Sequence, residues 1–165
     1  MPVVEKLSFH IISGDLDDPR VVELIRHHHE TARAQSPPES AHSLDVAGLK
    51  APDITFWAIW DGDALLGIGA LRRLPAQHGP AHGEIKSMHT SQEARRRGVA
   101  NVMLRHIIDT ARTDNLTRLS LETGAQDYFA PSRALYRRHG FVECAPYGDY
   151  RLDPNSVYMT LELKA

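Results

Sequence analysis

The chain contains little cysteine, with Cys144 as the single thiol among 165 residues. One thiol excludes a disulfide within the chain, as is usual for proteins of reducing compartments. Cys144 follows Phe141 in an apolar stretch, so we expect a packed thiol rather than a nucleophile. The N-terminus has no apolar signal core, and no apolar run is long enough to cross a bilayer. We therefore expect a cytoplasmic protein without a membrane partner.

An excess of one charge sign is also missing. The 19 basic and 21 acidic residues give a formal charge of −2, which argues against general affinity for nucleic acid. Phe56, Trp57 and Trp60 form an aromatic run in which no basic residue is interleaved, so we expect core or edge packing rather than base stacking. Nucleic acid is therefore not an expected partner.

Ten histidines raise the question of a metal site. His27, His28 and His29 are consecutive, and side chains of consecutive helical residues point in different directions, so a regular helix cannot bring the three to one ion. His78 and His82 flank a loop that supplies no third clustered ligand. We expect no metal.

The order of strand and helix patterns predicts the fold class. Asp18 and Pro19 suit the N-cap and first position of a helix, and Gly140 suits a helix end. Expected strands are 3–12, 55–60, 64–71, 84–90, 118–123, 141–145 and 157–163; expected helices are 19–33, 99–111 and 131–139, with a helical turn at 45–50 and loops at 36–44, 72–82 and 147–155. Without repeats or linkers, this order is typical of one mixed-sheet α/β or α+β domain over residues 1–165.

The junction between strand 84–90 and helix 99–111 suits an anion. The first turn of a helix has unpaired N–H groups and the positive end of the helix dipole. Gly98 and the small Ala100 allow a close approach, and Arg95 to Arg97 add charged donors. Many soluble proteins carry a basic loop before a helix, so a solvated loop is the alternative.

Two motifs together resemble one family. Arg95-Arg96-Arg97-Gly98-Val99-Ala100 is similar to the Q/R-x-x-G-x-G/A signature of GNAT acetyltransferases, and 135–141, LYRRHGF, resembles their L-Y-x-x-x-G-F segment. The resemblance covers nearly the whole chain. It implies the acyl-CoA N-acyltransferase fold, a mixed and mostly antiparallel sheet of about seven strands flanked by about four helices. Other phosphate motifs do not fit, because 67–69, GIG, lacks the rest of a dinucleotide fingerprint and no P-loop lysine follows a glycine.

The resemblance implies acetyl-CoA as co-substrate, held between strands 84–90 and 118–123. Its pantetheine amides would pair with backbone groups like an added strand, and its diphosphate would lie on the N–H groups of 96–102. The implied cofactor-binding residues are Met88, His89, Thr90, Arg95, Arg96, Arg97, Gly98, Val99, Ala100 and Ser132. Phe129 stands where many relatives carry asparagine, which puts one hydrogen bond to the cofactor in doubt.

The implied reaction is direct attack of an amine on the thioester in a ternary complex. Tyr136 matches the family tyrosine that lies near the sulfur and would protonate the departing thiolate; alternatively it only packs and hydrogen-bonds. Backbone N–H groups at 88–90 would bind the oxyanion. The base would be Glu84, or Glu122 acting through water, although either could be an ordinary exposed strand residue.

Strand alternation bears on the choice of base. It places Glu84, Lys86, Met88 and Thr90 on one face of their strand. If Lys86 pairs with Glu84, the carboxylate becomes less basic and its assignment as the base weakens.

The resemblance implies that the loop at 36–44 borders the acceptor, although it could equally be a plain surface connection, and the loop at 147–155 is expected on the same side. Glu39, His42, Asp149, Tyr150 and Asn155 are expected to line a polar pocket, with Glu122 near it. The expected acceptor is a primary amine of a small molecule, and a homodimer is possible. Alternatives are a non-catalytic acyl-CoA binding or sensor module and a protein or peptide N-acetyltransferase.

Overall fold

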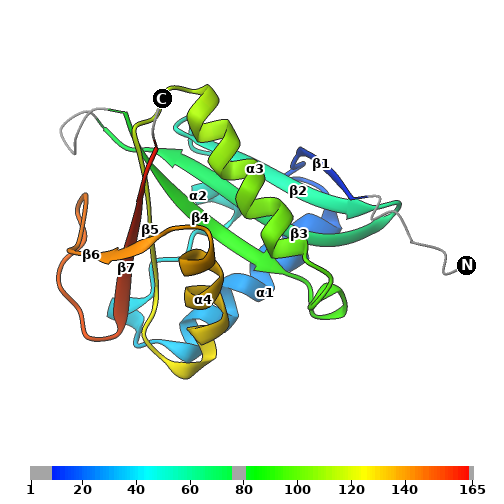
Figure 1. Cartoon of the computed structure of the whole chain (residues 1–165). Coiled ribbons are helices and arrows are strands. Elements are labelled where there is room, and N and C mark those ends of the chain that lie inside the picture. The colour runs from blue at the N-terminus through cyan, green and yellow to red at the C-terminus, as the bar shows by residue number, and fades with distance from the viewer. Residues whose placement is uncertain (1–8, 76–80, 164–165) are drawn as a thin grey trace, which may run out of the picture.

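A computed structural model describes residues 9–75 and 81–163, which form one sheet flanked by helices (Figure 1). Within these residues the sheet has seven strands in the order β1-β2-β3-β4-β5-β7-β6. Only β4 and β5 pair in parallel. The strands are β1 (His10–Ser13), β2 (Ile54–Asp61), β3 (Ala64–Arg73), β4 (His82–Thr90), β5 (Arg118–Gly124), β6 (Val142–Cys144) and β7 (Ser156–Glu162). The helices are α1 (Pro19–Gln35), α2 (Val46–Leu49), α3 (Val99–Thr113) and α4 (Ala130–Arg138).

The expected element order and the mixed, mostly antiparallel sheet are confirmed. Asp18 caps α1 by accepting a hydrogen bond from the Arg20 amide, and Gly140, at φ +96°, follows the end of α4. Of the expected first strand, residues 3–8 lie outside the described residues, and β1 covers its end. Cys144 is half-buried on β6, and burial raises the pKa of its thiol, as suits a packed side chain.

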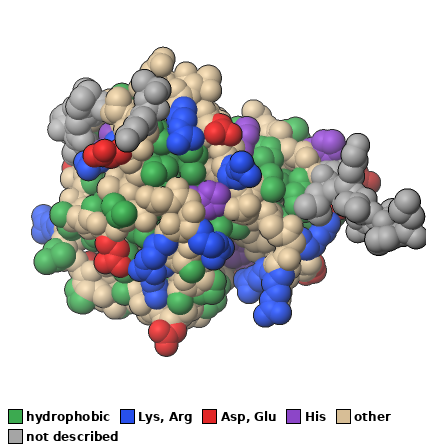
Figure 2. All heavy atoms as spheres, in the orientation of Figure 1, with side chains coloured by type: hydrophobic (Ala, Val, Ile, Leu, Met, Phe, Trp, Pro, Cys, Tyr) green, Lys and Arg blue, Asp and Glu red, His purple; other side chains and the backbone are tan. Residues whose placement is uncertain are grey.

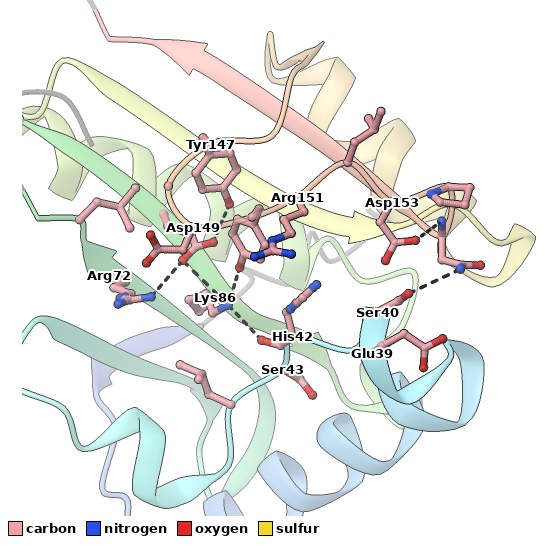
Figure 3. Close-up of a pocket in the computed structure, with 18 of the residues that line it drawn as sticks. Glu39, Ser40, His42, Ser43, Arg72, Lys86, Tyr147, Asp149, Arg151 and Asp153 are labelled. Carbon is pink, nitrogen blue, oxygen red and sulfur yellow. Dashed lines mark hydrogen bonds and ion pairs between the residues drawn. The ribbon is translucent and has the colours of Figure 1, made fainter. Parts of the chain in front are cut away.

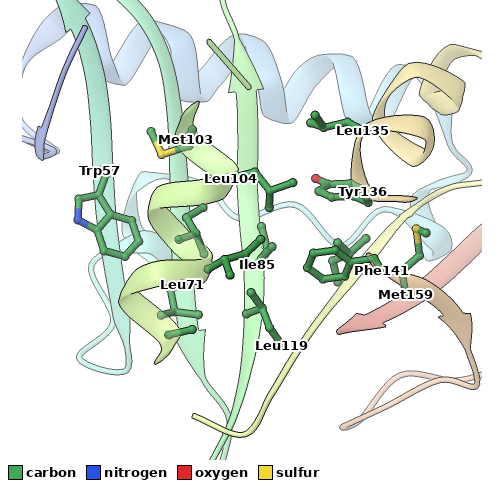
Figure 4. Close-up of a cluster of buried hydrophobic side chains, with 14 of the residues drawn as sticks. Trp57, Leu71, Ile85, Met103, Leu104, Leu119, Leu135, Tyr136, Phe141 and Met159 are labelled. Atoms are coloured by element: carbon green, nitrogen blue, oxygen red, sulfur yellow. The ribbon is translucent and has the colours of Figure 1, made fainter. Parts of the chain in front are cut away.

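Two apolar layers enclose the sheet. Helix α3 crosses one face and α1 lies against the other (Figure 1). On the α3 face, Leu104, Ile107 and Leu119 are fully buried in a cluster that extends to Tyr136 of α4 (Figure 4). On the α1 face, Val21, Ile25, Leu49, Phe56 and Ile68 form a second cluster. Phe56 and Trp57 are both buried, which confirms that they are core residues.

A bulge in β4 corrects the expected strand alternation. Ile68 pairs with His89 and Ala70 with Lys86, so Gly69 alone lies opposite two residues, Ser87 and Met88. Ser87 has φ +56°, and the extra residue reverses the side-chain directions that follow it. Met88 therefore packs against the α3-side cluster, and the prediction that it shares a face with Glu84 is wrong.

Strands β4 and β5 separate after a short paired stretch. Their last pair in register is Glu84 with Ser120, although β4 continues to Thr90 and β5 to Gly124. Backbone groups along the far half of β4 are thus available on this side, as the expected pantetheine pairing requires.

The helices of the described residues are too short or too polar to span a membrane.

Candidate active site

A groove of about 520 Å³ lies where β4 ends and α3 begins. Gly98 is the N-cap residue of α3 with φ +78°, a conformation that costs glycine little. The groove brings together most of the implied cofactor residues: Met88, His89, Thr90, Arg95, Arg96, Gly98, Val99 and Ala100. The unpaired N–H groups of the first helical turn and two exposed guanidinium groups make this groove suitable for a diphosphate.

Three details of the groove differ from the expected set. Arg97 turns away from it and forms an ion pair with Asp61 at 3.1 Å. Ser132 is not among the residues that line it, whereas Arg138 of α4 is. Lys and Arg side chains gather around α4 and the loop before α3 on the face in Figure 2. No sequence pattern singled out Arg138, because its place in the groove depends on how α4 packs beside α3.

A cavity of about 110 Å³ lies between the separating strands, next to the groove. It is lined by Met88 of β4, Glu122 of β5 and Tyr136 of α4. Tyr136 is only 7% exposed, and burial, together with nearby Glu122, raises the pKa of its hydroxyl. This hydroxyl therefore stays protonated at neutral pH.

The two candidate carboxylates have different surroundings. Burial raises the pKa of Glu122 to about 7, an effect that the nearby Ser156 hydroxyl and Lys86 ammonium oppose. Glu84 is 1% exposed and accepts a 2.6 Å hydrogen bond from the Tyr147 hydroxyl on Oε2. Its inaccessible Oε1 makes no hydrogen bond to the described residues. Glu122 thus combines a place in the cavity wall with a pKa near neutrality.

Lys86 and Arg72 flank Glu84. The Lys86 ammonium and the Arg72 Nη1 each lie 3.9 Å from Glu84 Oε1. Arg72 was expected in a loop, but β3 extends to Arg73, which places Arg72 directly opposite Glu84. The loop prediction is therefore wrong at this end; residues 76–80, including His78, lie outside the described residues.

A basin of about 700 Å³ adjoins the small cavity (Figure 3). The structure brings the whole expected polar set to its walls: Glu39, His42, Asp149, Tyr150 and Asn155. Glu122 lines the small cavity instead, and Ser40, His42, Ser43, Glu84 and Lys86 line both spaces. Groove, cavity and basin are thus neighbours, because Met88 similarly lines both the groove and the cavity.

Phe129, which stands at the family asparagine position, also lines the small cavity. It packs so closely over Gly124 that a Cβ there would lie 2.2 Å from its ring. The residue therefore supplies apolar contact where relatives supply an amide.

A pair of histidines lies between the cavity and the groove. The Nδ1 atoms of His28 and His89 are 2.9 Å apart, and the His27 ring meets that of His89 edge-on. His29 bonds to Ser43 instead, so the three consecutive histidines diverge as expected. Burial lowers the pKa of His28 to about 3 and that of His89 to about 4. Among the described residues no group of three or more His, Cys, Asp or Glu could hold a metal.

This histidine pair predicts a loss of stability in acid. Between pH 6.5 and about 4 the unfolded chain binds protons that the folded pair excludes, so stability is complete above pH 6.5 and falls as pH decreases. From pH 7 to 5, we expect each histidine to lower the free energy of unfolding by about 2 kcal/mol. Urea unfolding at both pH values measures this loss. The matched control is the double variant His28→Gln/His89→Gln, whose loss should be smaller; equal losses would contradict the prediction.

Comparisons with known proteins agree with this architecture. The chain is similar to the uncharacterized N-acetyltransferase YedL of Escherichia coli (strain K12), 48% identical over 94% of this chain and 95% of the relative. It is likewise 48% identical to the uncharacterized N-acetyltransferase YsnE of Bacillus subtilis (strain 168), over 93% and 99%.

Solved structures show the same fold. An acyl-CoA N-acyltransferase of Klebsiella pneumoniae superposes with a TM-score of 0.75 at 22% identity, over 95% of this chain and 99% of that one. A Bacillus subtilis acetyltransferase in complex with CoA gives 0.65 at 16% identity, over 94% and 99%. The acetyltransferase (GNAT) family model matches residues 20–141. The chain therefore belongs to the GNAT acetyltransferase family.

Proposed function

We propose that this GNAT acetyltransferase moves an acetyl group from acetyl-CoA to a primary amine of a small molecule, by direct attack in a ternary complex. The observation that carries the proposal is the sequence of three adjacent spaces, groove, cavity and basin, with Tyr136 and Glu122 lining the middle one. Donor and acceptor could then meet without leaving the protein, as direct transfer requires.

Acetyl-CoA supplies the thioester and fits the groove by its chemistry. Its diphosphate would lie on the N–H groups at the start of α3, beside Arg95 and Arg96. The described part of the structure gives neither guanidinium an ion pair, so both remain available. The related Bacillus subtilis acetyltransferase was solved with CoA, which supports this assignment.

The protein's own groups then have separate roles. Glu122 takes the proton of the acceptor ammonium, and the freed nitrogen attacks the acetyl carbonyl carbon. Backbone N–H groups at the end of β4 stabilise the oxygen as it gains charge. When the carbon–sulfur bond breaks, the Tyr136 hydroxyl donates its proton to the sulfur, and the second proton of the attacking nitrogen passes to the Tyr136 oxygen as the amide forms. Burial raises the pKa of this hydroxyl, and it also raises the basicity of a thiolate beside it, so proton transfer from oxygen to sulfur remains favourable.

The basin favours a small acceptor over a protein. A volume of about 700 Å³ is that of a pocket for one small molecule, and the loops at 36–44 and 147–155 both contribute to its walls. A sensor module would need the groove but no base, so a cavity-lining carboxyl with a pKa of about 7 favours the enzyme.

Calorimetric titration with coenzyme A, followed by a thiol-release assay over a panel of amines, tests the proposal. We expect binding and amine-dependent thiol release. Ala100→Glu should weaken coenzyme binding at least about tenfold, because its carboxylate would face the diphosphate. Thr113→Glu places the same charge at the opposite end of α3 and is the control. Absence of binding would overturn the proposal, and binding without thiol release for any amine would favour a sensor.

A further inference from the structure

The basin contains two cations whose hydrogen-bonding capacity is not filled. Lys86, with a side chain 9% exposed, donates to the His42 carbonyl oxygen at 3.1 Å and to the Tyr150 hydroxyl at 3.0 Å. An ammonium has three N–H groups, and Glu84 Oε1 at 3.9 Å is too distant to receive the third. A nearly buried ammonium with a free donor is costly unless a ligand uses it.

Arg72 extends the same basic surface. Its Nε donates to Asp53 at 3.1 Å, while its terminal nitrogen atoms form no hydrogen bond with the described residues. Figure 3 shows the Arg72 and Lys86 side chains on one side of the basin and Glu39 and Asp153 on the other. The planar guanidinium matches the two oxygen atoms of a carboxylate.

The position of Lys86 limits the acceptor further. It lines both the basin and the small cavity that contains Glu122, and its charge affects the pKa of Glu122. An acceptor ammonium ion beside this buried cation is repelled; Glu84, 3.9 Å from Lys86, offsets part of the repulsion, and a carboxylate on the acceptor would offset more. Because Lys86 borders both spaces, an amine in the cavity of about 110 Å³ and an anion on Lys86 can be only a few bonds apart.

We infer that the acceptor is a free α-amino acid. Its carboxylate binds Lys86 and Arg72, and its amino group faces Glu122 and Tyr136. The side chain of the acceptor occupies the basin. Tyr147 and Tyr150 provide an apolar wall there for a large or aromatic group, with their ring centroids 5.1 Å apart. This inference rests on the proposed acetyl transfer and adds the substrate class.

Matched acceptors separate this class from the alternatives. The probes are phenylalanine, methionine and histidine, each compared with its primary amide and with its decarboxylated amine, in the thiol-release assay. We expect kcat/KM for at least one free acid to exceed that of both its counterparts more than tenfold. Amides or simple amines used as well as the acids would overturn the inference and leave acetyl transfer intact; the amides also stand in for a peptide N-terminus. No release from any acceptor, with coenzyme bound, would overturn both.

Substitutions locate the preference. Lys86→Met should reduce the ratio of acid to amide kcat/KM to near one, whereas Lys50→Met, which removes an exposed lysine just after α2, should keep it. The ratio is insensitive to a general loss of active protein, and coenzyme binding by each variant reports on folding. Arg72→Met, at a more exposed position, should lower the same ratio and serves if Lys86→Met does not fold. An unchanged ratio in both folded variants would overturn the assignment.

Discussion

Replacing Tyr136 by phenylalanine is expected to lower kcat at least about 100-fold, while coenzyme A binds with nearly wild-type affinity. The hydroxyl lines the cavity between donor and acceptor, and its raised pKa keeps the proton on oxygen until a strong base forms beside it. A departing thiolate is such a base. Since binding depends on the groove and the start of α3, the loss should fall on kcat and not on coenzyme affinity. Steady-state kinetics and calorimetry measure the two quantities.

The matched control removes a different tyrosine hydroxyl. Tyr158 is also buried, but its hydroxyl donates to the Arg151 carbonyl oxygen at 2.6 Å and lines none of the three spaces of the site. Tyr158→Phe should therefore cost about 1 kcal/mol of stability and little of kcat. If Tyr136→Phe retains more than about one fifth of wild-type kcat, the hydroxyl does not serve the leaving group.

Local patterns in the sequence were sufficient for the order of the elements and for the position of the groove before α3. Helix α3 has its apolar residues at helical spacing, and Gly98 and the arginines precede it within one short loop. The interactions that form such a junction connect residues close in sequence. The acceptor side was harder to predict from the sequence, because Lys86 contacts His42 and Tyr150, which are 44 and 64 residues away along the chain. The family resemblance suggested which loops border the basin, but only tertiary packing places Arg72 and Tyr147 there.

The two errors on β4 and β3 have a common physical cause. Strand alternation holds only while each residue faces one partner. The bulge at Ser87 breaks this rule with no glycine or proline next to it in β4, because the glycine at this point, Gly69, lies on the partner strand. Likewise, β3 continues through Arg72 because β4 supplies a partner for it, which the sequence of β3 alone does not reveal. Pairing partners thus decide where a strand ends and which way its side chains point.

The choice between Glu84 and Glu122 shows the same limit. Both follow an apolar or small residue on neighbouring strands, so the strand pattern alone does not tell which carboxylate is the base. The structure separates them by their neighbours: Glu84 is fixed by Tyr147 between two cations, while Glu122 meets the cavity with few compensating charges. A carboxyl group acquires a pKa suited to accepting a proton at neutral pH from such surroundings, not from its place in the strand.

Glu122→Gln is therefore expected to lower kcat/KM at least about 100-fold and to abolish the acidic limb of the pH profile. In the wild-type protein, activity should rise with pH through about 7 as Glu122 loses its proton. An amine acceptor loses its own proton at about 8 or above, so the two limbs are distinguishable. Glu84→Gln should instead keep the limb near pH 7 while weakening the bond to Tyr147. A profile in which only Glu84→Gln removes the limb would assign the base to Glu84.

Stability provides an independent test of the same residue. The folded pKa of about 7 exceeds the ordinary value of 4.5, so the folded protein holds a proton that the unfolded chain releases. Ionised Glu122 thus destabilises the fold progressively as pH rises from about 4.5 to 7, and at pH 8 the cost approaches about 3 kcal/mol. Glu122→Gln should remove most of this cost, giving an inactive protein that is more stable than the wild type at pH 8 but not at pH 4.5. Chemical denaturation at both pH values measures the difference. If the difference in stability between Glu122→Gln and the wild type is the same at both pH values, burial does not raise the pKa of Glu122. The carboxyl would then lack the property that suits it to accept the proton of the amine.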